Sequence, residues 1–250
     1  VFAPILTPHS PSQIAIQHMF EGPSATYLLG TDQLGRDTLT RLLYGGRIAL
    51  QVAAIAVSIG LLIGLLLGMI AGYGPRWLDN TLMLAFDTIN SFPAIMLALA
   101  IITLTGPSLE MVIVVIVINS IPSYGRITRT QTLGIKHNEF ILAERAMGAG
   151  TLRVLFRHVM PNVAGPLLIL AAMNVPVVVT IEAGLSFLGL GVRPPTPSWG
   201  SMLSDGRQII RSTPWPVIAG GIPLILTTLG FTFLGEALRD IFDPRLRKSK

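Results

Sequence analysis

Long runs of apolar residues dominate the chain, and most polar residues are confined to the stretches between them. A run of roughly 20 apolar residues is long enough to cross a bilayer as a helix. Strands of a membrane barrel would instead alternate apolar with polar residues, so the continuous runs predict helices. Five spans are predicted on this basis, at Ile48–Pro75, Thr88–Leu109, Met111–Gly125, Val159–Ile181 and Ser212–Gly235.

Breaks within and between the runs predict turns and bends. Gly106-Pro107 is the only break between the second and third runs, so these two spans should form a tight hairpin. The third run is short, and we expect its helix to include residues Pro107–Glu110. Pro166 and Pro176 interrupt the fourth span, which predicts a bend near Val175.

Two polar regions next to the predicted spans are expected to lie outside the membrane. Leu29–Arg47 predicts a short surface helix before the first span, with Asp37 as its N-cap and Asp32 in a turn. Turn and cap roles are favoured over an acid-base pair for these two carboxylates. Gly191–Pro216 is rich in Pro, Trp and Gly, so a stiff loop is expected there.

A basic, helix-prone segment, AERAMGAGTLRVLFRHVMPN, separates the third and fourth spans at Ala143–Asn162. Residues 138–147 favour helix, Gly148 and Gly150 break it, and residues 152–159 resume it, so two short helices at an angle are predicted, with Pro161 starting the next span. The segment is too polar for the bilayer and too apolar for a solvated loop. Its small residues Ala143, Ala146 and Gly148 therefore predict close packing against a soluble partner.

The composition agrees with an integral membrane protein, because 51% of the residues are hydrophobic and only 12% are charged. The mean hydropathy is +0.65. The absence of cysteine excludes disulfides and thiolate metal sites. A net charge of +5 could suggest nucleic acid, but the positions of the basic residues indicate membrane topology instead, and no nucleic-acid partner is expected.

Basic residues are distributed unequally between the two sides that the spans define. Twelve of the eighteen fall on one side, at Arg76, Arg126, Arg129, Lys136, Arg145, Arg153, Arg157, Arg239, Arg245, Arg247, Lys248 and Lys250. The positive-inside rule places that side in the cytoplasm, with the C-terminus. Residues 1–47 are then external, and we expect Val1–Pro8 to be the end of a further span upstream, giving six spans in all.

Several polar residues are predicted at membrane depth. A charged carboxylate at mid-bilayer costs at least about 2.5 kcal/mol, so Asp87 should face the bundle interior or the inner interface. Glu182 should reach the outer interface, either as a partner of the external loop or as a lining group of a pathway. The candidates for the translocation pathway, or alternatively for helix packing, are Asp87, Asn90, Ser91, Asn119 and Glu182.

A resemblance covers nearly the whole chain. LAERAMG, nine residues and HVMP, at Leu142–Pro161, resemble the EAA loop of type I importer permeases of the ABC superfamily, although Leu142 stands for its first Glu and Glu144 for its second Ala. LGTDQLGRD, EAGLSFLGLG, PPTPSWGSML and GEALRDIFDPRLR resemble the C-type subunit of the dipeptide, oligopeptide and nickel branch.

The resemblance implies an all-α, polytopic bundle with the type I ABC importer permease fold, having five full spans here and a further one upstream. It implies a coupling element that docks on a cytoplasmic ATPase. The residues expected to couple are Phe140, Ala143, Glu144, Arg145, Ala146, Gly148, Gly150, Arg157 and Pro161. Implied partners are a second homologous permease, two cytoplasmic ATP-binding subunits, an external solute-binding protein and membrane lipid.

The chain itself is expected to bind no cofactor or metal and to carry no catalytic residue, with ATP and Mg on the partner ATPases. Its three lysines do not follow glycine in a phosphate-binding loop, and it has no H-E-x-x-H or G-x-S-x-G motif. An intramembrane enzyme is therefore disfavoured. A channel or ion-driven transporter would not need the angled cytoplasmic element.

We accordingly expect a multi-pass protein of the bacterial inner membrane. Its predicted regions are an external N-terminal part (1–46), a transmembrane domain (47–238) with a coupling loop (126–161), and a basic cytoplasmic tail (239–250). Short peptides are the expected cargo, and nickel chelates, glutathione or another small solute are the alternatives.

Overall fold

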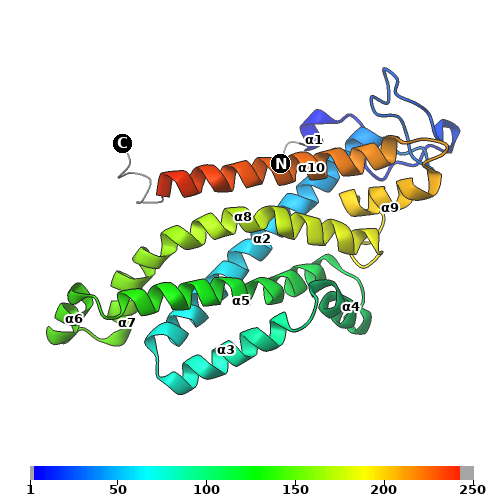
Figure 1. The fold of residues 1–250 in the computed structure, drawn as a ribbon. Coiled ribbons are helices and arrows are strands. Elements are labelled where there is room, and N and C mark those ends of the chain that lie inside the picture. Colours follow the sequence, from blue (N-terminus) through cyan, green and yellow to red (C-terminus); the bar gives the residue numbers. More distant parts are fainter. Residues whose placement is uncertain (1–2, 243–250) are drawn as a thin grey trace. The chain divides into compact units, whose positions relative to one another are not determined.

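The computed structural model describes residues 3–242, which are mainly helical. The helices in chain order (Figure 1) are α1 (Ala3–Leu6), η1 (Ile16–His18), α2 (Thr38–Tyr73), α3 (Arg76–Asn90), α4 (Ala94–Thr105), α5 (Leu109–Ile135), α6 (Glu139–Ala146), α7 (Thr151–Val154), the π-helix η2 (Leu155–Val159), α8 (Met160–Phe187), α9 (Trp199–Ile209) and α10 (Trp215–Phe242). The predicted all-α class is confirmed. Most of the predicted basic tail and the first two residues of the predicted upstream span lie outside the described residues.

The described residues contain four helices that are long and apolar enough to cross a membrane, at Thr38–Tyr73, Leu109–Ile135, Thr151–Phe187 and Trp215–Ile241. The predicted second span is broken, because α3 and α4 pass the same test only when they are taken together as a bent pair. Pro93, which lies directly before α4, explains the break: proline lacks an N–H donor and disfavours helix at the residue before it. The five predicted spans are therefore present only if this bent pair counts as one of them.

Two other boundaries differ from the sequence prediction, and the predicted bend in the fourth span is not tested. The expected surface helix before the first span is not separate, because α2 continues from Thr38 to Tyr73. The third span extends well past Gly125, so Arg126 and Arg129 lie inside α5. The fourth span continues through Pro166 and Pro176 without a break, and the bend near Val175 stays a prediction.

The described residues form two compact units. One contains residues 3–55, 95–115 and 175–230, and the other contains residues 56–94, 116–174 and 231–242. We refer to them as the first and the second unit. The helices α2, α5, α8 and α10 each contribute residues to both.

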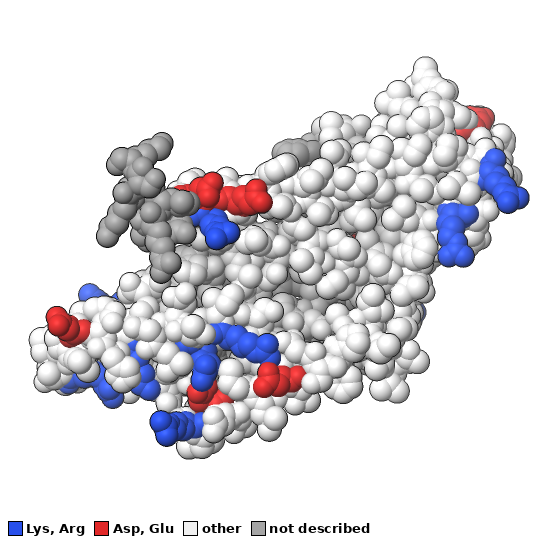
Figure 2. Space-filling view, viewed as in Figure 1, with Lys and Arg blue, Asp and Glu red and all other residues white. Residues whose placement is uncertain are grey.

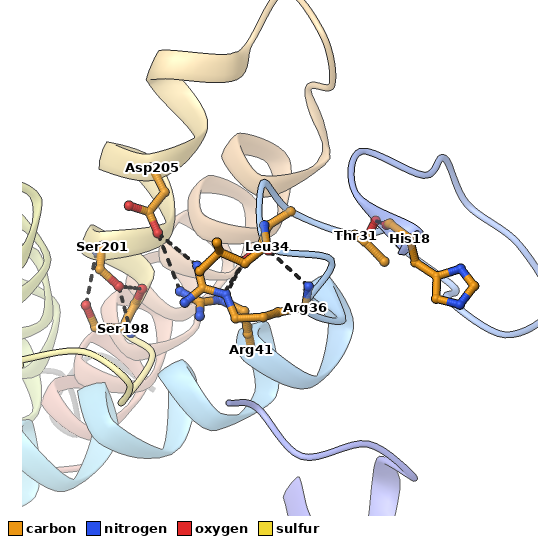
Figure 3. A network of polar contacts seen from close by, with 9 residues as sticks. His18, Thr31, Leu34, Arg36, Arg41, Ser198, Ser201 and Asp205 are labelled. Atoms are coloured by element: carbon orange, nitrogen blue, oxygen red, sulfur yellow. Dashed lines mark hydrogen bonds and ion pairs between the residues drawn. The ribbon is translucent and has the colours of Figure 1, made fainter. Parts of the chain in front are cut away.

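In the first unit, buried charges tie the N-terminal segment to α2 and α9 (Figure 3). The Asp32 carboxylate accepts hydrogen bonds from the backbone N–H of Leu34, at 2.9 Å, and from Nε of Arg36, at 2.6 Å. Arg36 and Arg41 also reach Asp205 of α9, at 3.4 and 3.6 Å. Turn and network roles, and not acid-base chemistry, therefore account for Asp32.

Asp37 caps α2 as predicted. Its Oδ2 accepts a hydrogen bond from the backbone N–H of Thr40 at 3.1 Å, which satisfies one of the donors that the first helical turn leaves unpaired. The Thr40 hydroxyl donates to the same oxygen. Asp37 and Thr40 are both buried, so this cap is part of the packed structure.

Helix α9 occupies the stretch that was expected to be a stiff loop. Ser198 and Ser201 form a reciprocal capping box at its start, with both hydrogen bonds at 3.1 Å. Trp199 is 4% exposed, and its indole N–H donates to the carbonyl oxygen of Leu42 on α2 at 2.9 Å. Gly46 of α2 leaves room for the ring, because a Cβ there would lie 2.8 Å from it. The Trp199 contacts join α9 to residues far away in the sequence, and the loop prediction did not take them into account.

In the second unit, α2 and α5 pack closely along a row of glycines. The α2 glycines recur every fourth residue, at Gly60, Gly64, Gly68 and Gly72, which places them on one face of the helix. A Cβ on each would collide with α5; at Gly72, for example, it would lie 2.7 Å from the Thr132 Cβ. Small residues thus allow the two backbones to approach.

Replacing Gly68 with alanine should destabilise the second unit. The added Cβ would contact the Gly125 carbonyl oxygen and lie 2.5 Å from the Thr128 Cβ, and the backbone cannot yield cheaply. We expect a loss of about 1–3 kcal/mol, measured as a lower thermal unfolding midpoint in detergent. Gly165→Ala on α8, where a Cβ meets open space, is the matched control. Equal midpoints for the two variants would contradict the close-packing account.

Candidate functional site

The segment from Glu139 to Val159, which we call the elbow, reverses the chain direction between α5 and α8. Its first helix, α6, ends in a Schellman motif. The backbone N–H of Gly148 donates to the Arg145 carbonyl and that of Ala149 to the Glu144 carbonyl, both at 3.0 Å. Gly148 has φ of +85°, which side chains with a Cβ rarely adopt. The predicted break after α6 is therefore present, and it depends on this glycine.

A second short helix was predicted for the second half of the elbow, but this half is not a separate helix. Gly150 precedes α7, and α7 continues through the π-helix η2 directly into α8. Thr151–Phe187 consequently forms one helix of 37 residues. Pro161 lies in the first turn of α8. Its missing N–H is tolerated there because the preceding turn is the irregular π-helix η2.

The inner side of the elbow is anchored in the core of the second unit. Ile141 of α6 and Val154 of α7 have no exposed surface and belong to the same apolar cluster as Tyr73 of α2 and Tyr124 of α5. Leu155 and Val159 extend this cluster along η2. The elbow is thus fixed to α2, α5 and α8 by buried side chains.

Polar contacts add to this anchoring. The Glu144 carboxylate of α6 lies 3.4 Å from Nε2 of His158 in η2. The guanidinium of Arg145 and the ammonium of Lys136 each lie 5.5 Å from the centre of the Tyr73 ring. Cations within about 6 Å of an aromatic ring are attracted to its face.

The outer side of the elbow exposes large apolar side chains. Each is at least 44% exposed, and they are Phe140, Leu142, Met147, Leu152 and Phe156. Small exposed residues lie among them, at Ala143, Ala146, Gly148 and Gly150. Of the nine predicted coupling residues, all except the half-buried Glu144 are exposed.

Charged residues surround this apolar surface. Lys136, Glu139, Glu144, Arg145, Arg153 and Arg157 all occur in or next to the elbow. Figure 2 shows basic side chains gathered over α3, α5 and the elbow, with a few acidic ones among them. So many charges argue against burial in lipid, because each is costly there. The exposed apolar surface of the elbow is therefore suited to a protein partner.

Three of the predicted pathway residues gather at the end of α3. The Asp87 carboxylate accepts a hydrogen bond from Nη2 of Arg126 at 2.6 Å, and the Ser91 hydroxyl donates to the Asp87 backbone carbonyl at 2.8 Å. With the Asn90 amide oxygen turned toward Arg126, that oxygen lies 3.0 and 3.2 Å from the guanidinium nitrogens. The side chains of Asp87 and Arg126 are 67% and 40% exposed. Asp87 is thus a helix-pairing residue that remains accessible.

The other two predicted pathway residues lie elsewhere. Asn119 is half-buried in the middle of α5. Glu182 is completely buried in α8, in the first unit, and its Oε1 accepts a hydrogen bond from the Ser186 hydroxyl on the same helix at 2.8 Å. A pathway role for either residue stays a prediction.

Sequence reasoning missed two features of this site. It assigned Arg126 and Arg129 to a loop, whereas they pair with Asp87 and Asp79 of α3. The spacing of the two arginines, three apart on α5, was the available signal, since such residues share a helix face. Tyr73 gave no local signal, because both of its cationic neighbours are more than sixty residues away in the sequence.

Comparison with known proteins identifies the family. Residues 64–248 match the family described as the binding-protein-dependent transport system inner membrane component. The match covers more than half of the chain. The chain belongs to this family.

Relatives match over nearly the full length of the chain. The dipeptide transport system permease protein of Alkalihalophilus pseudofirmus is 41% identical over 247 residues, covering 99% of this chain and 81% of the relative. The di/tripeptide permease protein of Pseudomonas aeruginosa is 38% identical, with 100% and 84% covered. The glutathione transport system permease protein of Pectobacterium atrosepticum is 39% identical, with 91% and 75% covered.

Solved structures of other transporters share the fold. The inward-facing MetNI methionine ABC transporter matches with a TM-score of 0.68 at 19% identity, covering 81% of this chain and 96% of that chain. An amino acid ABC transporter matches with a TM-score of 0.56 at 19% identity, covering 79% and 92%. The predicted type I ABC importer permease fold is confirmed by these similarities.

Truncating Ile141 should destabilise the isolated subunit, whereas truncating its neighbour Leu142 should not. Ile141 is completely buried in the core cluster, and Leu142 is 49% exposed. We expect Ile141→Ala to cost about 2–5 kcal/mol of unfolding free energy, and Leu142→Ala much less. Denaturation of the detergent-solubilised chain, followed by circular dichroism, measures both. Similar losses for the two variants would be inconsistent with an elbow that has one buried and one exposed side.

Proposed function

We propose that the chain is the membrane-spanning permease subunit of an ATP-driven importer of short peptides. The observation that carries the proposal is the two-sided elbow, whose inner side is fixed in the core and whose outer side exposes Phe140, Leu142, Met147, Leu152 and Phe156. A rigid projection with an apolar surface among charges can transmit a push from a docked protein. The family, a component of binding-protein-dependent transport systems, supports this use.

The partners follow from the same proposal. Two cytoplasmic ATP-binding subunits bind ATP and Mg, and one of them receives the elbow. A second homologous permease completes the membrane pathway, and an external solute-binding protein delivers the cargo. The chain itself performs no catalysis and holds no cofactor.

This assembly assigns a side of the membrane to each region. The coupling loop (126–161) and the C-terminal tail (239–250) face the cytoplasm, and residues 1–46 face outward. The transmembrane domain (47–238) lies in the bacterial inner membrane. The excess of basic residues in the loop and tail supports this orientation.

Short peptides are the proposed cargo because the dipeptide and di/tripeptide permeases match nearly the whole chain. Glutathione is the second candidate, since a glutathione permease is 39% identical. Asp87, Asn90, Ser91, Asn119 and Glu182 are the proposed pathway residues. Of these, Asp87 offers an accessible carboxylate beside the Arg126 guanidinium, which could face the charged ends of a peptide.

Reconstitution of the complex tests the function directly. The chain is co-expressed with its genomic neighbours, purified, and placed in liposomes with ATP inside or outside. We expect uptake of a labelled dipeptide that requires both ATP on the elbow side and the external binding protein. Unlabelled dipeptide should reduce this uptake more than glutathione does. Uptake that continues without any ATPase subunit would instead indicate a channel or a secondary transporter.

Within this complex, Leu152→Ser should weaken binding of the ATPase subunit. Leu152 is 70% exposed, so the substitution should cost the isolated chain little stability. A docked partner, in contrast, would lose an apolar contact. We expect the dissociation constant to rise about fivefold to tenfold, measured by titrating detergent-solubilised permease with ATPase. Leu28→Ser is the matched control, because Leu28 is 61% exposed in the region that the proposed orientation places outside. Equal effects of both variants would count against docking at the elbow.

Gly148→Val should uncouple ATP hydrolysis from uptake while leaving membrane insertion intact. Space around Gly148 is open, so the change acts through its φ of +85°, where a Cβ costs about 1–2 kcal/mol. Relief of this strain would change the orientation of α6 relative to α7. The readout is dipeptide taken up per ATP hydrolysed.

Two further variants make this test specific. Gly148→Asn should retain most of the coupling, because asparagine tolerates the left-handed conformation. Gly134→Ala on α5 is the control, since its Cβ also meets open space and its backbone is helical. Normal uptake per ATP in Gly148→Val would contradict the coupling role.

A further inference from the structure

The C-terminal end of α2 carries a ring that two cations approach from different elements. Tyr73 is the last residue of α2 and is 8% exposed. Arg145 belongs to α6, and Lys136 follows the end of α5; each charge lies 5.5 Å from the ring centre. The Lys136 ammonium also donates to the carbonyl oxygen of Gly72 at 3.4 Å. Three helices of the second unit therefore meet at one aromatic side chain.

The ring of Tyr73, and not its hydroxyl, makes these contacts. The hydroxyl oxygen is buried and has no hydrogen-bond partner among the described residues. The ring belongs to the apolar cluster that also contains Ile141 of α6 and Val154 of α7. A phenylalanine could therefore supply the same interactions, whereas an aliphatic side chain could supply only the packing.

The other attachments of α6 differ from this one in kind. Ile141 holds α6 by apolar packing, which is non-directional, and Glu144 reaches η2 through His158. Arg145 lies in the last turn of α6, so its attraction to the Tyr73 ring is a specific link from α6 to α2. A displacement of α6 that separates the charge from the ring loses that attraction.

We infer that Tyr73 is a positioning residue through which a displacement of the elbow reaches α2. Arg145 contacts the ring from the elbow, and Lys136 holds the end of α5 to the same ring. Arg145 was predicted from the sequence to be a coupling residue. In this proposal it couples the elbow to the helix bundle, through the Tyr73 ring. The inference rests on the proposed function, because it concerns the transmission of movement that the ATPase subunits cause.

The test uses the complete complex in liposomes and compares substitutions that keep or remove the ring and the charge. Tyr73→Leu keeps an apolar side chain and removes the ring, and Arg145→Gln removes the charge. We expect each to lower dipeptide uptake per ATP hydrolysed about fivefold, with hydrolysis itself maintained. Tyr73→Phe and Arg145→Lys should restore uptake per ATP toward that of the unmodified complex. Tyr44→Leu, in the first two turns of the same helix, is the matched control.

A double substitution separates a specific link from general damage. If the ring and the charge act as one contact, Tyr73→Leu combined with Arg145→Gln should lower uptake per ATP little more than either change alone. Additive losses, or equal uptake per ATP for Tyr73→Leu and Tyr73→Phe, would overturn the inference. If Tyr73→Leu prevents assembly, the exposed Arg145 still allows the test through Arg145→Gln and Arg145→Lys.

Failure of this inference is distinguishable from failure of the proposed function. An unmodified complex that shows no ATP-dependent uptake contradicts the function itself. A complex that transports with ATP and remains fully coupled after Tyr73→Leu and Arg145→Gln contradicts only the role of the ring.

Discussion

The close approach of α2 and α5 is the constraint on which the second unit depends. Glycine at every fourth position of α2 removes the side chains that would hold the helices apart, so Tyr124, Thr128 and Thr132 of α5 contact its backbone. This approach puts Tyr73 and Lys136, at the ends of the two helices, beside one another. It also forms the cluster into which Ile141 inserts. An elbow can be rigid only if the surface beneath it is rigid, and the glycine contact provides that surface.

The elbow combines two opposite requirements in one short segment. Its inner residues must be buried to resist a force, and its outer residues must stay exposed to receive one. Neighbouring positions in α6 divide these tasks, since Ile141 is buried and Leu142 is not. Gly148 ends α6 before α7 begins, and the two hydrogen bonds of its cap fix the backbone at this end.

Much of this could be predicted from the sequence, because the governing signals are local. Apolar runs located the long helices, Asp37 marked the start of α2, and Gly148 marked the end of α6. Pro93, directly before α4, is an equally local signal for the break in the second span. Helix α9 and the Tyr73 contacts could not be found in this way. Gly45 and Gly46 of α2 leave the space in which Trp199 is buried, and Arg145 meets Tyr73 only through the fold.

The π-helix η2 determines the direction in which the outer side of the elbow points. A π turn contains about one residue more than an α turn, and one residue corresponds to a rotation of about 100° around the helix axis. Leu152 lies before this turn, and the body of α8 lies after it. The angular setting of Leu152 relative to the body of α8 therefore depends on this surplus residue. Deletion of one residue in η2 would rotate Leu152 around the helix axis relative to α8, while the helix itself stays continuous.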